Sequence, residues 1–319
     1  MRKSVDEMMA NLTEDGNYTT TDQYFLCTSV VRTSEETFIL ATGLPLSIIA
    51  FLGNVVIICS LQRVSSLHPP SKLLFGCLAF TDLGVGLIVH PLRFGRYLSL
   101  DHSKTCHYLS IIYLVTGFVF AGLSLLTITA ISVDRLFALS LGLGYRQVVT
   151  VKRVRALIAC FWVSIALLAT VVFQSVRIAL GIAFAVLLSC TIISTFCYIK
   201  IYHALRLRLS PAQRQGHQGQ PNGEGIQQSK ARYKETVSTA VWVQMTLLAC
   251  YLPYGLVGAS KAITGLNTPS LSLALTLSTS LLLSNSTINP FLYCWRIREI
   301  KQDVKEKIRR FCCLSSEET

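Results

Sequence analysis

The chain has 319 residues, of which 51% are hydrophobic and only 14% are charged, and its mean hydropathy is +0.50. A soluble domain carries about 25% charged residues, so this composition excludes an ordinary soluble enzyme. It also excludes a disordered chain, because disordered chains are poor in apolar residues. The net charge of +12 would suit nucleic-acid binding only if the basic residues gathered on one face. They lie in short gaps between apolar runs, so no nucleic-acid partner is expected.

Seven apolar segments follow one another along the chain, and each reaches the roughly 20 residues that a membrane-spanning helix needs. The second, Leu73–Leu92, contains one charged residue, Asp82, and the other six contain none. Those six are Thr37–Gln62, Thr105–Val133, Ala156–Val176, Ile178–Ile199, Thr236–Ser260 and Ala262–Trp295. We therefore expect an all-α membrane protein, built as a seven-transmembrane-helix bundle.

The distribution of charge predicts the orientation of this bundle. An odd number of spans places the two termini on opposite faces, and 21 of the 29 basic residues fall on the face that holds the C-terminal tail. The positive-inside rule makes that face cytoplasmic. The N-terminal segment is acidic and carries N-glycosylation patterns at Asn11 and Asn17, which favours an extracellular N-terminus.

These patterns divide the chain into three parts. Residues 1–37 form an extracellular, glycosylatable segment, residues 38–296 form the seven-helix domain, and residues 297–319 form a cytoplasmic amphipathic helix and tail. No apolar stretch precedes Thr37, so the first span is expected to act as the membrane anchor. The expected location is the plasma membrane, which the chain crosses several times.

Polar side chains recur inside the apolar spans, where they are costly and therefore candidates for function. The first span holds Gly53-Asn54, the second contains Thr81-Asp82, the third ends in Asp134-Arg135-Leu136, and the seventh reads Asn289-Pro290-Phe291-Leu292-Tyr293. Trp162, Tyr198 and Pro253 lie in the fourth, fifth and sixth spans. Together this set resembles the rhodopsin-like G-protein-coupled receptors, from the first span to the tail.

The resemblance implies an allosteric sodium site in the middle of the bundle. The matching residues all carry oxygen-bearing side chains, and they are Asp82, Ser124, Asn285, Ser286 and Asn289. Oxygen-rich neighbours suit a hard cation. The alternative is a protonated Asp82 within a polar network that only holds helices together. No other metal or cofactor is expected.

The resemblance also implies a switch for the G protein at the cytoplasmic side, formed by Asp134, Arg135, Tyr198 and Tyr293. An arginine that merely extends its side chain toward the membrane surface is the alternative for Arg135. Positions that match the family's helix-packing and hinge residues are Asn54, Trp162, Tyr251, Pro253 and Pro290. Tyr251 stands where the family usually has Trp, and Cys190 stands where its fifth helix usually has Pro.

The sixth span lacks the acid that in the family often holds the switch arginine. Tyr233 occupies that place, and Glu235 lies two residues later, on another face of a helix. We therefore expect a weakly held inactive state and high signalling without ligand.

Cysteines and amphipathic spacing supply further expectations for the two ends of the chain. Cys27 and Cys106 fall on the outer side, where they either form a disulfide or remain free. After the seventh span, apolar residues recur at helical spacing at Ile297, Ile300, Val304, Ile308 and Phe311. The following Cys312 and Cys313 are candidates for palmitoylation, and unmodified thiols are the alternative.

The residues predicted on the outer side exclude some ligand classes but do not identify the ligand. The second outer loop shrinks to about Gln174–Arg177, which resembles the melanocortin receptors and their cannabinoid, lysophospholipid and adenosine relatives. Gly117 occupies the position at which amine receptors have Asp. Leu283 lies near the position of the retinal-binding lysine of opsins. Gly258 occupies the position at which adenosine receptors have Asn. A monoamine or retinal is therefore not expected, and a peptide or lipid-like ligand is.

Basic residues surround the predicted outer mouth, namely His90, Arg93, Arg96, Lys104, Arg177 and Lys261. They either attract an anionic ligand or are solvated and paired with the acidic N-terminal segment.

The sequence thus favours a receptor, not an enzyme, with an extracellular ligand, a heterotrimeric G protein, arrestin and membrane lipid as partners. Two alternatives stay open at this point. One is a receptor-like scaffold that signals only with a partner receptor, and the other is a transporter or channel.

Overall fold

The computed structural model describes residues 33–65, 67–99, 103–174, 176–215, 245–261, 263–264, 268–296, 300–306 and 309. Within these ranges the regular structure is helical, and no strand occurs. The long helices are α2 (Thr33–Arg63), α5 (Ser103–Leu141), α7 (Val151–Gln174), α8 (Val176–Gln215) and α10 (Pro269–Arg296). A further helix covers 245–261, and 300–306 are helical after the last long helix.

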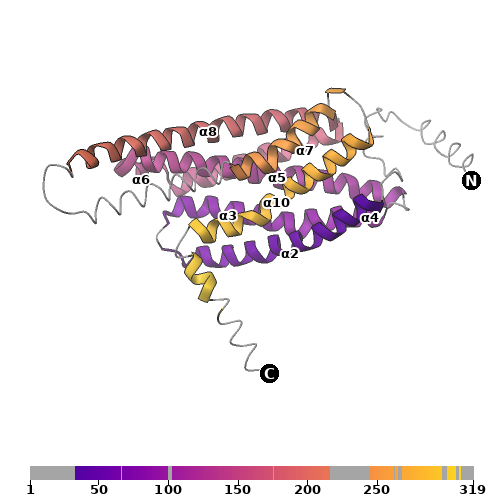
Figure 1. The fold of residues 1–319 in the computed structure, drawn as a ribbon, viewed down its shortest axis with the longest axis horizontal. Helices are drawn as coiled ribbons and strands as arrows, with labels where there is room; N and C mark the ends of the chain where they lie inside the picture. Colours follow the sequence, from indigo (N-terminus) through magenta and orange to yellow (C-terminus); the bar gives the residue numbers. More distant parts are fainter. Residues whose placement is uncertain are drawn as a thin grey trace, which may run out of the picture.

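The helices lie lengthwise beside one another in a bundle (Figure 1). α5 occupies its centre, since it packs against α3 (Pro69–Gly84), α4 (His90–Leu98), α7 and α8. α10 packs mainly against α2. This arrangement is the predicted all-α bundle of seven membrane helices.

Six helices in the described part of the chain are long and apolar enough to cross a membrane, judged by length and composition. They are Ala41–Arg63, Pro69–Leu98, Tyr108–Leu141, Val151–Val172, Ile178–Ala204 and Pro269–Cys294. The seventh predicted span, Thr236–Ser260, corresponds to the helix over 245–261, and its first residues lie outside the described ones.

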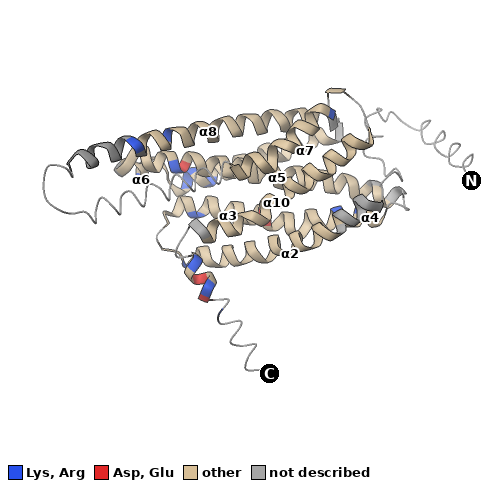
Figure 2. Ribbon diagram, in the orientation of Figure 1, with Lys and Arg blue, Asp and Glu red and all other residues tan. Residues whose placement is uncertain are grey.

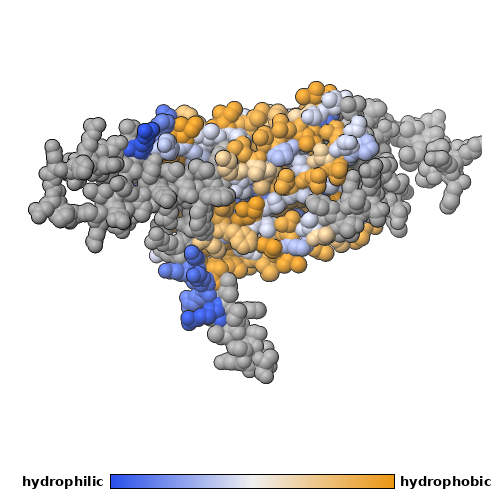
Figure 3. Space-filling model, viewed as in Figure 1, coloured by the Kyte–Doolittle hydropathy of each residue, from blue (hydrophilic) through white to orange (hydrophobic). Residues whose placement is uncertain are grey.

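Apolar side chains cover the middle of the bundle surface, where a soluble protein would place charges (Figure 3). Ile192, Leu167 and Phe291 are each more than 60% exposed. Exposing such side chains to water is unfavourable by about 25 cal/mol per Å². Basic residues gather mainly at the end of the bundle where α6 (Tyr145–Val148) lies, which we name the α6 end (Figure 2). The opposite end, which holds α4, is the α4 end.

The second span is not a uniform helix, because a π-helical segment, η2 (Val85–Val89), separates α3 from α4. The backbone N–H of His90 bonds to the carbonyl of Val85, five residues before it, whereas in an α-helix it would bond four residues before. The next residue, Pro91, has no backbone N–H and makes no such bond. The widened turn adds one residue to the helix and so changes which residues share a face.

Two helices continue beyond their apolar segments. α5 continues to Leu141, eight residues beyond the charge-free segment, so Asp134 and Arg135 lie within the helix of the third span, as predicted. α8 continues to Gln215, well beyond the apolar segment that ends at Ile199. Charged residues that cannot lie in a membrane can still extend a helix, because adding a residue to an existing helix needs no new nucleus.

Candidate functional site

The middle of the bundle contains a buried carboxylate, Asp82 on α3, which is 0% exposed. Ser286 Oγ and Ser124 Oγ donate to its Oδ1 at 2.9 and 3.2 Å, and Asn289 Nδ2 donates to its Oδ2 at 2.6 Å. The donors come from α5 and α10, so this carboxylate joins three helices. Four of the five residues predicted for the sodium site therefore meet around Asp82.

The fifth predicted residue, Asn285, is buried but bonds elsewhere. Its Nδ2 donates to Tyr251 Oη at 3.4 Å, which connects α10 to the helix over 245–261. Carboxylate and hydroxyl oxygens are suitable ligands for a hard cation. Asp82, Ser124 and Ser286 supply such oxygens in direct contact, so the residues fit a small cation as well as a hydrogen-bonded network.

Asn54 connects the first and seventh spans close to this site. It is 0% exposed, and its Nδ2 donates to the carbonyls of Ala50 at 2.8 Å and Ser286 at 3.0 Å. Beside it, a Cβ on Gly53 would lie 2.9 Å from Cγ of Pro290. Glycine at 53 therefore allows the close approach of α2 to α10.

The remaining predicted packing residues lie in helices as expected. Trp162 on α7 contacts Phe80 on α3, with ring centroids 6.3 Å apart. Pro253 is half-buried within the helix over 245–261.

A second buried carboxylate, Asp134 on α5, lies toward the α6 end and accepts hydrogen bonds from three residues. Arg135 Nη2 and Ser71 Oγ donate to its Oδ2, each at 2.8 Å. Tyr145 Oη donates to its Oδ1 at 2.5 Å. Asp134 is 4% exposed, so the switch pair predicted from sequence is formed and is mostly shielded from water.

Tyr145 reaches Asp134 because the chain reverses just after α5. A short 3-10 helix, η3 (Gly142–Gly144), makes this turn, and Gly142 has φ of +52°, a conformation that favours glycine. Burial, together with the hydrogen bond to Asp134, raises the pKa of Tyr145 above its ordinary value. The phenol therefore stays protonated and remains a donor.

Phe75 on α3 contacts both Arg135 and Tyr293 of the seventh span. The Arg135 guanidinium carbon lies 5.7 Å from the centroid of the Phe75 ring, and Tyr293 meets the same ring edge-on at 5.3 Å. Tyr198, the other predicted tyrosine, accepts a hydrogen bond from Ser132 Oγ at 3.1 Å. The positions of Tyr233 and Glu235 lie outside the described residues.

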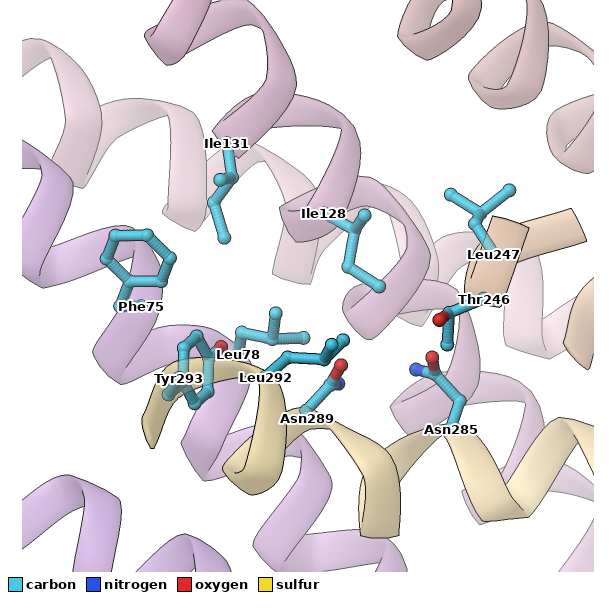
Figure 4. Close-up of a pocket in the computed structure, with 10 residues that line it drawn as sticks. All are labelled: Phe75, Leu78, Ile128, Ile131, Thr246, Leu247, Asn285, Asn289, Leu292 and Tyr293. Carbon is cyan, nitrogen blue, oxygen red and sulfur yellow. The ribbon is translucent and has the colours of Figure 1, made fainter. Parts of the chain in front are cut away.

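A cavity lies among α3, α5, α10 and the helix over 245–261 (Figure 4). Its empty volume is about 510 Å³, counting the space at its mouth. The polar lining residues are Asn285, Asn289, Thr246 and Tyr293, and apolar side chains such as Ile128 supply the rest. Space therefore exists between the helix over 245–261, α5 and α10, at the level between Asp82 and Arg135.

Cys106 on α5 is buried and disulfide-bonded. The other seven described cysteines are free, so its partner lies outside the described residues, as does the predicted partner Cys27. α7 ends at Gln174 and α8 begins at Val176, which confirms that the connection between them is very short.

The segment after α10 packs back onto the bundle. Ile300 is 0% exposed, Val304 packs against the hydrophobic core, and Asp303 forms an ion pair with Arg63 at 3.0 Å. The predicted amphipathic helix is thus seen over 300–306. The modification sites Asn11, Asn17, Cys312 and Cys313 lie outside the described residues.

Sequence reasoning missed Ser71, Phe75 and Tyr145, which contact the Asp134–Arg135 pair. Ser71 and Phe75 precede Asp82 in the same span at helical spacing, a signal that could have found them. No spacing rule could have found Tyr145, because its position depends on the turn at Gly142. The predicted basic rim also differs at two positions, since His90 and Arg93 are each 4% exposed and Arg93 bonds to α10.

Comparison with known proteins agrees with this geometry. The family described as 7 transmembrane receptor (rhodopsin family) matches residues 53–178 and 170–293. Adenosine receptor A2a of dog (Canis lupus familiaris) is 24% identical over 298 residues, covering 83% of this chain and 71% of that receptor. Adenosine receptor A3 of sheep (Ovis aries) is 25% identical over 284 residues, covering 79% and 84%.

Amine receptors are similar over a smaller part of the chain. Dopamine receptor 2 of Caenorhabditis elegans is 33% identical over 153 residues, covering 44% of this chain and 18% of that receptor. The family match runs from the first span to the seventh and includes both buried carboxylate sites. The chain therefore belongs to the rhodopsin family of seven-transmembrane receptors.

Proposed function

We propose that this receptor transmits the binding of an extracellular peptide or lipid-like ligand to a heterotrimeric G protein. Membership of the family makes it a G-protein-coupled receptor and not an enzyme. The observation that supports the proposed switch is the cluster at the α6 end, where Arg135 is bonded to Asp134 and stacked on Phe75. Release of Arg135 from these contacts would free a guanidinium for the G protein, and a ligand would act by shifting that equilibrium.

The α6 end would face the cytoplasm and the α4 end the outside. The basic residues gathered at the α6 end support this orientation (Figure 2). We also propose that Cys106 pairs with Cys27, which would attach the N-terminal segment to the outer end of α5. Glycosylation at Asn11 and Asn17, palmitoylation at Cys312 and Cys313, and contacts with arrestin and lipid remain predictions.

The sodium site is proposed as an allosteric element of the same receptor. Asp82 would supply the charge and Ser124 the nearby hydroxyl oxygen, with Ser286 and Asn289 completing the surroundings. A cation held there would restrain α3, α5 and α10 relative to one another. It would thereby favour the arrangement in which Arg135 stays bonded to Asp134.

A monoamine ligand is not proposed, although amine receptors are among the relatives. A buried ammonium group needs a carboxylate partner. Gly117 faces Val89, since a Cβ there would lie 3.8 Å from the Val89 side chain, and it offers no charge. Retinal is not proposed either, because Leu283 is buried in the seventh span where a Schiff base would require lysine.

The test is ligand-free activation of a panel of Gα subunits in cells, with the unmodified receptor beside Arg135→Glu at equal surface expression. Basal activity that exceeds receptor-free cells and disappears in the variant would support the proposed switch and the weakly held inactive state. Basal activity that survives Arg135→Glu would refute the proposed role of Arg135.

Silence of the receptor alone, followed by activity on co-expression with a second receptor, would favour the scaffold alternative instead. Ion flux through the purified protein in vesicles would favour a channel or transporter.

A further inference from the structure

A buried cation that the proposed switch does not use lies at the α4 end. Arg93 on α4 is 4% exposed, and its Nη2 donates to Thr276 O at 3.1 Å and to Ser280 Oγ at 2.8 Å, both on α10. Neither acceptor carries a charge. Among the described residues, the ion pairs involve Arg63 and Arg135, and no carboxylate pairs with Arg93. A buried charge without a counter-charge is unfavourable, so this guanidinium is prepared for an anion.

His90 lies one helical turn before Arg93 and is also 4% exposed. Its Nδ1 and Nε2 are both buried, and neither has a hydrogen-bond partner in the described part of the chain. A neutral imidazole carries one donor and one acceptor, and leaving both unsatisfied away from water is costly. Because residues three apart on a helix lie side by side, a group that bonds Arg93 can also reach His90.

The π-helical segment η2 determines on which face of the second span His90 and Arg93 lie. In a regular α-helix each residue advances by about 100° around the axis, so a residue eight positions on is rotated by about 80° from the first. The extra residue in η2 brings His90 to the same face as Asp82, which lies eight positions earlier and points into the bundle. His90 and Arg93 are therefore buried within the bundle and do not face the lipid, and Arg93 reaches α10.

The surroundings of the pair are apolar and aromatic. Val85, Val89 and Leu283 form a small buried cluster, against which Tyr113 and Phe120 pack. A ligand anchored at Arg93 would therefore place an apolar body beside this cluster. Such a combination of one charged anchor and a largely apolar wall is common in small-molecule sites.

We propose that His90 and Arg93 bind the acid group of an amphiphilic ligand, a carboxylate or phosphate monoester carried on a long apolar chain. The planar guanidinium would donate to the acid oxygens, and His90 would donate one further hydrogen bond to them. Thr276 and Ser280 hold the guanidinium in place from α10. This inference rests on the receptor function proposed above and narrows its ligand class.

The experiment measures the thermal unfolding midpoint of the purified full-length receptor in a non-ionic detergent, with four probes that share one tail. Oleate and 1-oleoyl lysophosphatidic acid are the acids, while oleamide and 1-oleoylglycerol are their uncharged counterparts. A compound that binds only the folded state raises the midpoint. We expect at least one acid to raise it and both uncharged counterparts to leave it unchanged, and the acid that acts identifies the headgroup as carboxylate or phosphate.

Three variants assign the effect to the pair. Arg93→Gln is expected to weaken the apparent affinity for the active acid by about 30-fold or more, because the charged partner is lost. Arg155→Gln is the matched control, since it removes the same charge from an exposed position near the start of α7, and it is expected to leave the affinity within a few-fold. If Arg93→Gln does not fold, His90→Phe decides, because it keeps Arg93 and removes only the second donor.

Equal midpoint shifts with the acids and their uncharged counterparts would overturn the proposal. A full response of Arg93→Gln to the acid would also overturn it. If Arg93→Gln does not fold, a full response of His90→Phe would do the same. Absence of any shift with all four probes would overturn it as well. Failure here is distinct from failure of the receptor function. Basal Gα activity that depends on Arg135 would persist, and only the acid anchor would be wrong.

Discussion

Asp134 receives hydrogen bonds from Arg135, Ser71 and Tyr145, and only the first of these is charged. If Arg135 leaves as proposed, the carboxylate still keeps two donors and is not left unpaired in an apolar interior. Breaking the pair is therefore less costly than breaking an ion pair that has no other partners. This arrangement agrees with the expectation of a weakly held inactive state.

Removing one of the remaining donors tests this reasoning. Tyr145→Phe should lower basal Gα activation, because Asp134 then depends more strongly on Arg135. It should also lower the free energy of unfolding by about 1.5–3 kcal/mol, the usual effect of losing a hydrogen bond to a charged group. Tyr202→Phe is the control, since Tyr202 is exposed on α8. Higher basal activity in Tyr145→Phe would contradict the argument.

Asp82 permits a second test at the same scale. If Asp82 holds sodium, replacing K⁺ by Na⁺ at constant ionic strength should raise the unfolding midpoint of the purified receptor, and Asp82→Asn should abolish that difference. Asp303→Asn is a suitable control, because Asp303 pairs with Arg63 at the bundle surface and should leave the sodium response intact. No preference for Na⁺ in the unmodified receptor would favour the protonated network.

The sequence identified most of this chemistry, because a charged or amide side chain inside an apolar span is rare and conspicuous. Asp82, Ser124, Ser286 and Asn289 were all predicted to meet, and they do. The hydroxyl partners of Asp134, Ser71 and Tyr145, were not predicted, since hydroxyl side chains are common in membrane proteins. Whether a serine bonds a carboxylate depends on helix rotation and register, which hydropathy does not report.

Helices themselves were predictable in number and approximate place, whereas their ends were not. Hydropathy reports where a helix lies in the membrane, but α5 and α8 continue as helices beyond the apolar residues. The π-helical segment of the second span could have been anticipated from Pro91, whose missing N–H breaks the regular bonding pattern. Its effect on the faces of His90 and Arg93 required the structure.

Close packing of η2 against α2 leads to a prediction about glycine. Ser47 Oγ donates to Gly86 O at 2.7 Å, and a Cβ at position 86 would lie 2.8 Å from the backbone nitrogen of Phe51. Gly86→Ala must therefore push two backbones apart, and it should destabilise the receptor by about 1–3 kcal/mol.

The matched control lies in the same span. A Cβ on Gly76 would meet nothing within 4 Å, so Gly76→Ala should leave the packing intact and stabilise α3 by about 0.5–1 kcal/mol through its helix propensity. The thermal unfolding midpoints of the two variants check the predictions, since Gly86→Ala should lower the midpoint and Gly76→Ala should raise it. Equal midpoints for the two would show that the approach of η2 to α2 is not tight.

Across the whole molecule, the second span contributes to every level of the bundle. Ser71 bonds Asp134 at the α6 end, Asp82 forms the central site, and Arg93 bonds α10 at the α4 end. α5 and α10 pack around this span and supply most of the partners. Movement of either helix against the second span would therefore alter more than one site, which is how binding at one end can influence the other.

The cavity between Asp82 and Arg135 provides the space for such movement. Ile128 on α5 is 6% exposed and points into it (Figure 4). Ile128→Phe should fill part of this space and raise the free energy of unfolding by about 0.5–2 kcal/mol. It should also reduce basal Gα activation, because α10 and the helix over 245–261 then have less room to rearrange. Ile112→Phe makes the same change on the exposed side of α5 and should affect neither quantity. A lower unfolding midpoint with higher basal activity in Ile128→Phe would mean that the phenyl ring strains the resting bundle, and that the cavity is not free space used by the switch.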